Sequence, residues 1–189
     1  HGYWVMDYRG GVAAFGDAVH ADDADPALPG GWSAIGIVAQ PRATRGYWIL
    51  ADSGAVYAYG GAPYLGGANG AIPAGMEAVG MAPTPSGNGY WIVSSEGGVY
   101  AFGDAQHYGG TNTSLPAGWF ATSLTPTASG RGYWILANSG AVYTFGDAQY
   151  YGGANGAIPG TDLPAVSLQT TPTGSGYWIM SRAGGIYSF

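Results

Sequence analysis

The tripeptide Gly-Tyr-Trp occurs five times, at residues 2–4, 46–48, 89–91, 132–134 and 176–178, so its spacing is 44, 43, 43 and 44 residues. A fixed period of about 40–50 residues marks an array of small units, each of which must stack on a neighbour to bury its apolar face. We therefore interpret residues 1–189 as one domain with repeat units 2–45, 46–88, 89–131 and 132–175 and a partial unit 176–189.

Each unit predicts short strands. Residues 90–95 are aromatic and β-branched, Gly97 and Gly98 supply a turn, and residues 99–102 alternate in bulk, which together predict a β-hairpin. The same hairpin is expected at residues 3–15, 47–59, 133–145 and 177–189. An aromatic segment such as 106–108, a connection rich in Gly, Asn and Pro such as 152–159, and an apolar segment such as 78–82 complete the unit. Gly, Pro and period-two patterning disfavour helix throughout.

Four short antiparallel strands in about 43 residues are typical of one blade of a β-propeller, so we predict an all-β propeller. The segments containing Gly36, Ala39, Gly80 and Ala82 are expected to be innermost, where small side chains let backbones approach. Five hairpins predict five blades, of which the first lacks an inner strand and the last lacks an outer strand. A four-bladed ring with a spare hairpin and an open β-array are the alternatives.

Composition excludes several partners. Charged residues make up 8% of the chain, the net charge is -6, and all five basic residues are Arg without any basic run. This pattern argues against nucleic acid and against an anionic membrane surface as partners. No apolar stretch approaches the ~20 residues that span a bilayer. The chain has no Cys, which excludes disulfides and thiolate metal sites, and the Tyr-, Trp- and Gly-rich composition fits an extracellular protein.

The repeat carries a resemblance. The run Gly-Tyr-Trp-Ile, followed by Val-Tyr-x-Phe-Gly-Asp-Ala and Tyr-Gly-Gly, resembles repeats in secreted and surface proteins of actinobacteria, which are often attached to cell-wall-acting or other hydrolase domains. It covers essentially the whole chain and implies a location at or beyond the cell surface. By architecture the chain is also similar to the tachylectin-type five-bladed lectins, which bind amino sugars between blades. Their sugar-binding motifs do not occur here, so no ligand residue is carried over.

Candidate catalytic residues are few. His20 and His107 occupy nearly the same position in their units, where other units have Tyr64 and Tyr150, which indicates a surface or packing position. No Gly-x-Ser-x-Gly elbow is present. We expect no enzymatic activity and no cofactor.

The carboxylates are also interpreted as structural. Asp17, Asp104 and Asp147 follow Phe-Gly once per unit, and the repeat symmetry would hold them apart, whereas glycoside hydrolysis needs two carboxylates facing one bond. We expect each to accept backbone N–H groups within its own turn. The acidic residues within 22–25 offer Ca²⁺ ligands, but the segment lacks the glycine of the EF-hand loop, so a solvated loop is favoured and no metal is expected.

The aromatic residues give the candidate ligand site. The Trp of each tripeptide is interpreted as core between blades, whereas Trp32 and Trp119 occur in only two connections and are candidate stacking platforms. Sugar recognition combines aromatic faces with neutral amides and hydroxyls. The connections supply that combination in Tyr64 with Asn69, Tyr108 with Asn112, and Tyr151 with Asn155. Asn in these loops is equally typical of a turn.

These residues predict a non-catalytic, secreted, lectin-like binding module for a neutral glycan or cell-wall polysaccharide. The alternative is a structural or protein-interaction scaffold in a fibre or a multi-subunit extracellular assembly. In that case a neighbouring subunit would complete the incomplete first and last blades.

Overall fold

The computed structural model describes residues 2–25, 27–42 and 45–189, and in this part of the chain it contains strands and turns without helix. The described strands are β1 (Tyr3–Met6), β2 (Val12–Phe15), β3 (Ala34–Ala39), β4 (Tyr47–Ala51), β5 (Val56–Tyr59), β6 (Ala78–Pro83), β7 (Gly89–Ser94), β8 (Val99–Gly103), β9 (Ala121–Pro126), β10 (Gly132–Ala137), β11 (Val142–Gly146), β12 (Ala165–Thr170), β13 (Tyr177–Ser181) and β14 (Ile186–Ser188). No helix long and apolar enough to cross a membrane occurs among these residues.

The strands form five antiparallel sheets in chain order. The first sheet pairs β1 with β2, and the others have the orders β3-β4-β5, β6-β7-β8, β9-β10-β11 and β12-β13-β14. All five predicted hairpins are confirmed, and the first sheet lacks an inner strand as expected. In each three-stranded sheet the predicted small-residue segment is the first strand, and β3, β6, β9 and β12 contact one another in sequence.

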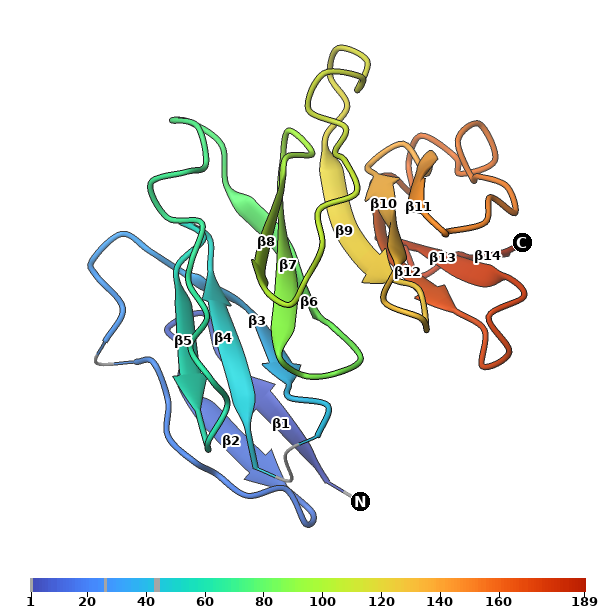
Figure 1. The fold of residues 1–189 in the computed structure, drawn as a ribbon. Coiled ribbons are helices and arrows are strands. Elements are labelled where there is room, and N and C mark those ends of the chain that lie inside the picture. Colours follow the sequence, from blue (N-terminus) through green and yellow to red (C-terminus); the bar gives the residue numbers. More distant parts are fainter. Residues whose placement is uncertain (1, 26, 43–44) are drawn as a thin grey trace.

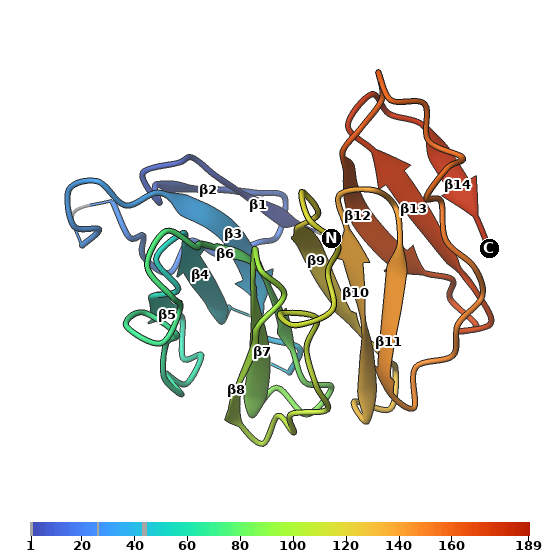
Figure 2. The same cartoon turned by 90° about the horizontal axis from the view of Figure 1, so that it is seen from above.

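The sheets follow one another around a curve, each facing the next (Figures 1 and 2). Among the described strands, those of the first sheet do not contact those of the last. The five sheets therefore form an open arc, with one face of the first sheet and one face of the last sheet left without a neighbouring sheet.

The prediction of a fourth strand per unit is wrong, because residues 106–108 and 149–151 form no strand. The backbone of the first of these segments is bonded to side chains of two different sheets. The Gln106 carbonyl accepts the indole N–H of Trp91 at 2.8 Å, and the Tyr108 N–H donates to the Tyr133 hydroxyl at 3.0 Å. The segment therefore ties adjacent sheets together instead of extending one of them.

Each inner strand contains a β-bulge near its start, for example between Ala78 and Gly80 of β6. Gly80 lies where the inner strands crowd. A Cβ atom placed there would lie 3.4 Å from the Val93 side chain and 3.7 Å from the backbone N of Leu124 in the next sheet. The small residue thus lets β6 approach both its own sheet and β9.

The core lies between consecutive sheets. Tyr and Trp of each repeated tripeptide point to opposite faces of the strand, so the Trp faces the next sheet and the Tyr faces the previous one. The expected burial of the repeated Trp residues is confirmed for Trp48, Trp91 and Trp134. The Trp-to-Tyr ring pairs across the four junctions are Trp4–Tyr47, Trp48–Tyr90, Trp91–Tyr133 and Trp134–Tyr177, with centroids 5.3–5.9 Å apart.

Candidate binding cleft between the last two sheets

Each sheet has two ends, which line up into two rims of the molecule, and the predicted site residues divide between these rims. The hairpin rim is formed by the hairpin turns at 52–54, 95–97 and 138–140, and the inner-turn rim is formed by the turns at 84–88, 127–131 and 171–175 that follow each inner strand. The connections run from one rim to the other. For example, the Asp104 N–H donates to the Asn88 carbonyl on the inner-turn rim, and the Thr111 N–H donates to the Gly97 carbonyl on the hairpin rim.

The predicted asparagines lie on the hairpin rim. Their loops dock on the hairpin turns through bonds such as the Ala154 N–H to the Gly140 carbonyl at 2.8 Å. The side chains of Asn69, Asn112 and Asn155 fold back over the glycine two residues earlier. A Cβ at Gly153 would lie 2.8 Å from Asn155 Oδ1. This geometry fits the turn-forming role of Asn.

The predicted tyrosines do not join those asparagines in one site. The hydroxyl groups of Tyr108 and Tyr151 donate to the Gly130 and Gly174 carbonyls at 3.4 and 3.0 Å, on the inner-turn rim. Asn112 and Asn155 lie on the opposite rim. Tyr64 is 63% exposed and stands at the repeat position of His107.

Trp32 and Trp119 lie toward the hairpin rim and are half-buried, so they are less open than the stacking-platform interpretation requires. The backbone N–H of each closes a turn onto a Pro carbonyl, at Pro29 and Pro116 respectively. The second unit has Met76 and the fourth unit has Asp162 at this position, so the turn does not require an aromatic side chain.

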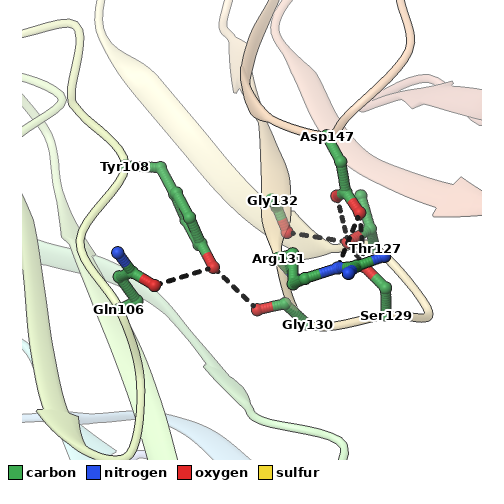
Figure 3. A network of polar contacts seen from close by, with 8 residues as sticks. All are labelled: Gln106, Tyr108, Thr127, Ser129, Gly130, Arg131, Gly132 and Asp147. Atoms are coloured by element: carbon green, nitrogen blue, oxygen red, sulfur yellow. Dashed lines mark hydrogen bonds and ion pairs between the residues drawn. The ribbon is translucent and has the colours of Figure 1, made fainter.

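The carboxylates of Asp104 and Asp147 bind hydroxyl groups of another turn, which the sequence did not predict. A bond from the Asp147 backbone N–H also lowers the pKa of that carboxyl, in line with the expected role in its own turn. Asp147 Oδ1 accepts the Thr127 hydroxyl at 2.8 Å, Oδ2 accepts the Ser129 hydroxyl at 2.6 Å, and the Arg131 Nε lies 3.7 Å from Oδ2 (Figure 3). Asp104 makes the same pair of bonds in the unit before. The carboxylate fastens the end of the hairpin to the turn that follows the inner strand.

Electrostatics at this network favour the ionised carboxylate. The hydrogen bond from Ser129, the bond from Thr127 and the charge of Arg131 lower the pKa of Asp147 below its ordinary value, and desolvation opposes them. Asp147 is therefore anionic at neutral pH, with both oxygens already accepting hydrogen bonds from the protein.

A cleft of about 630 Å³ opens beside this network on the inner-turn rim, between the last two sheets. Its lining combines aromatic, amide, hydroxyl and carboxylate groups, namely Trp134, Tyr151 and Trp178; Gln149 and Gln169; Thr127, Ser129, Thr170, Thr171 and Thr173; Asp147; and Ala128, Pro172 and Gly174. A smaller cleft of about 190 Å³ lies at the equivalent place beside Asp104. Of the eight predicted ligand residues, all within the described chain, Tyr151 alone lines the larger cleft.

Trp178 distinguishes the larger cleft. Its counterparts donate their indole N–H groups to carbonyls fifteen residues later, as Trp134 does to Gln149 at 2.8 Å. Trp178 is 39% exposed, and within the described residues its indole N–H has no hydrogen-bond partner. Trp178 thus lines the cleft at one edge, and its exposed ring also faces a second hollow on the outer face of the last sheet.

A repeated pattern marks the cleft residues that the sequence interpretation missed. Thr-x-Ser or Thr-x-Thr precedes Gly-Tyr-Trp at 84–86, 127–129 and 171–173. In the third and fourth units, which begin after the first two of these, Phe-Gly-Asp follows at 102–104 and 145–147. Read together, the two motifs locate the rim on which the clefts lie.

The carboxylates of the acidic segment at 22–25 accept hydrogen bonds from backbone N–H groups of the same segment. The Asp23 N–H donates to Asp22 Oδ1 at 2.9 Å, and the Asp25 N–H donates to Asp23 Oδ1 at 3.3 Å. Among the described residues no group of three or more His, Asp or Glu side chains is placed to hold a metal ion.

These stacked, radially arranged antiparallel sheets define a β-propeller, which confirms the predicted fold class. Among solved structures, the chain is similar to the β-propeller domain of Cps50 (Swd1) from Myceliophteria thermophila, with 12% sequence identity and a TM-score of 0.52 over 97% of this chain and 67% of that chain. At this identity the likeness concerns the fold. The chain matches no protein-family model and no curated protein.

Proposed function

We propose that the chain is a non-catalytic binding module that takes a neutral, polyhydroxylated ligand in the cleft between its last two sheets. A neutral glycan or a cell-wall polysaccharide has this chemistry. The observation that carries the proposal is the combination of an accessible Trp178 ring with the exposed amides of Gln149 and Gln169 in one cleft. A pyranose presents a C–H face to an aromatic ring and hydroxyl groups to amides, so this lining suits it.

The charge distribution supports the same ligand class. Asp147 is the charged side chain that lines the cleft, and its two oxygens are already occupied by the hydroxyl groups of Thr127 and Ser129. A cationic ligand would have to compete with these bonds, whereas a neutral ligand can use the amide groups without disturbing them. The network therefore shapes the cleft wall.

We extend the proposal to location. The resemblance of the repeats to secreted and surface proteins of actinobacteria, together with the lysine-free and cysteine-free composition, supports a protein that acts outside the cell. There the ligand would be a surface polysaccharide held by a rigid module.

A glycan array identifies the ligand, and calorimetric titration then compares variants. Gln149→Ala and Gln169→Ala should each weaken binding by about tenfold, the effect of losing one hydrogen bond of about 1.4 kcal/mol. Asn112→Ala on the hairpin rim is the matched control and should bind like the wild type. Absence of binding to every glycan, or an equal loss in Asn112→Ala, would contradict this site.

A scaffold role is the second candidate function, and a separate observation favours it. The first and last sheets each expose an apolar face whose counterparts in the other sheets are covered by a neighbour. This observation leads to an interaction surface that shares Gln169 and Trp178 with the cleft but extends over Met180 and Ile186 and includes a separate face on the first sheet.

A further inference from the structure

The interior junctions define what a complete interface between sheets contains. At the junction of the third and fourth sheets, Trp91, Val93 and Val99 of one sheet pack against Tyr133 and Ile135 of the next. The Trp and Tyr rings lie 5.8 Å apart. The face turned toward the next sheet thus carries Trp and aliphatic side chains, and the face turned toward the previous sheet carries Tyr and Ile, with Phe145 of the same sheet packed beside them.

The last sheet exposes the Trp-type half of this interface. Trp178, Met180 and Ile186 are 39%, 40% and 61% exposed. They stand at the repeat positions of Trp134, Leu136 and Val142, which are covered by the last sheet. Together with Ser167 and Gln169 they line an open hollow of about 310 Å³.

The first sheet exposes the Tyr-type half. Tyr3, Val5 and Phe15 are 60%, 51% and 46% exposed, and they stand at the repeat positions of Tyr133, Ile135 and Phe145. The rings of Tyr3 and Phe15 are already stacked, with centroids 5.2 Å apart.

We propose that the chain associates head to tail with a second copy of itself, the exposed face of the last sheet in one copy receiving the exposed face of the first sheet in the other. Trp178 takes the role of Trp91, and Tyr3 of the second copy takes the role of Tyr133. Each copy then covers an apolar face that is costly to leave in water. Because the two faces differ, the contact is heterologous and extends into rings or filaments.

Four interior junctions of the same design support this choice of occupant. Each already joins a Trp-type face to a Tyr-type face within the chain, with the ring pairs 5.3–5.9 Å apart. The contact between two copies repeats the packing of strands at an interior junction, without the covalent connection that joins neighbouring sheets of one chain. We therefore expect reversible, concentration-dependent association.

Sedimentation velocity of the 189-residue chain over a wide concentration range tests the proposal. The wild type should sediment faster as its concentration rises, and both Trp178→Asp and Tyr3→Asp should stay monomeric. Tyr64→Asp is the matched control, because Tyr64 is 63% exposed away from both faces, and it should assemble like the wild type. Circular dichroism checks the fold, and Met180→Asp and Val5→Asp replace any variant that fails to fold.

Mixing the two monomeric variants tests the head-to-tail geometry. The Trp178→Asp copy keeps its first-sheet face and the Tyr3→Asp copy keeps its last-sheet face, so an equal mixture should form heterodimers that grow no further. A monomeric wild type at every concentration, unchanged assembly in either variant, or an inert mixture would each overturn the proposal.

The outcome is separable from that of the proposed function. Tyr3 lies on the first sheet and the cleft lies between the last two sheets. Tyr3→Asp should therefore lose assembly and keep glycan binding, whereas Gln149→Ala should weaken glycan binding and keep assembly.

Discussion

The indole of Trp91 packs against the ring of Tyr133 in the next sheet, with centroids 5.8 Å apart and an interplanar angle of 59°. Both side chains are fully buried. The Trp91 indole N–H donates to the Gln106 carbonyl at 2.8 Å, and the Tyr133 hydroxyl donates to the Gly109 carbonyl at 2.6 Å. One dipeptide, Tyr-Trp, thus builds both sides of every junction, because successive residues of a strand point to opposite faces.

Trp91→Ala should therefore destabilise the chain by about 3–5 kcal/mol, through lost burial and a residual cavity. Trp178→Ala removes the same side chain from the same motif, but Trp178 is 39% exposed. Its cost in the monomer should be about 1 kcal/mol or less. Urea unfolding at low protein concentration gives both values. Equal losses in the two variants would show that the junction does not supply the difference.

The first glycine of the Tyr-Gly-Gly motif should tolerate no side chain. Gly109 has φ of 132°, and a Cβ there would lie 2.7 Å from the Phe145 ring. Gly109→Ala should cost about 3 kcal/mol, from backbone strain and from overpacking. Gly118→Ala is the control, because Gly118 has φ of 82° with no atom within 4 Å of the added Cβ, and it should cost about 1 kcal/mol. Thermal unfolding of both variants measures the difference, and a Gly109→Ala protein as stable as Gly118→Ala would refute the close contact.

The sequence predicted the hairpins and the inner strands because their signals are local. Alternating side chains and Gly-containing turns lie within a dozen residues of one another. The outer segment 106–108 carries the same aromatic signal, yet it forms no strand because one of its partners is the Tyr133 side chain, 25 residues away in another sheet. Propensity alone does not show where a backbone N–H finds its acceptor.

The site was harder to predict than the fold. The cleft depends on Asp147 reaching Thr127 and Ser129, a contact that spans 18–20 residues and joins two turns. The exposure of Trp178 depends on which sheet faces it, and the motif around it is the same as around Trp91. The repeat fixed residue types at each position, whereas the access of a ligand depends on neighbours that the motif does not encode.

The carboxylate network predicts an acid-side dependence of stability. Ser129→Ala removes the bond that most lowers the pKa of Asp147, so the pKa of that carboxyl should rise toward its ordinary value. Because the folded-state pKa lies below the unfolded-state pKa, the network stabilises the fold above the unfolded-state pKa, and this stabilisation is lost as pH falls through the folded-state pKa.

The variant should therefore be less stable than the wild type at neutral pH, and the difference should shrink in acid. NMR titration of the Asp147 carboxyl measures the shift directly. Thr113→Ala, on the opposite rim, should leave the titration unchanged. An unmoved Asp147 pKa in Ser129→Ala would show that the hydroxyl bond does not set it.

Buried tyrosines predict the opposite dependence in alkali. Burial raises the pKa of Tyr90 to about 12, and its hydroxyl donates to the Gly66 carbonyl at 2.6 Å. The unfolded chain releases the Tyr proton near its ordinary value of about 10 while the folded chain retains it, so stability is full below about pH 10 and falls as pH rises toward the folded-state pKa. Tyr90→Phe removes this titration and also leaves the Leu65 N–H without its acceptor.

The Tyr90→Phe variant should be about 1–3 kcal/mol less stable than the wild type at neutral pH, and its stability should decline less between neutral and alkaline pH. Urea unfolding across this pH range gives both curves, with Tyr64→Phe, at an exposed side chain, matching the wild type at neutral pH. Parallel curves for the wild type and Tyr90→Phe would show that the Tyr90 hydroxyl does not carry the alkaline loss.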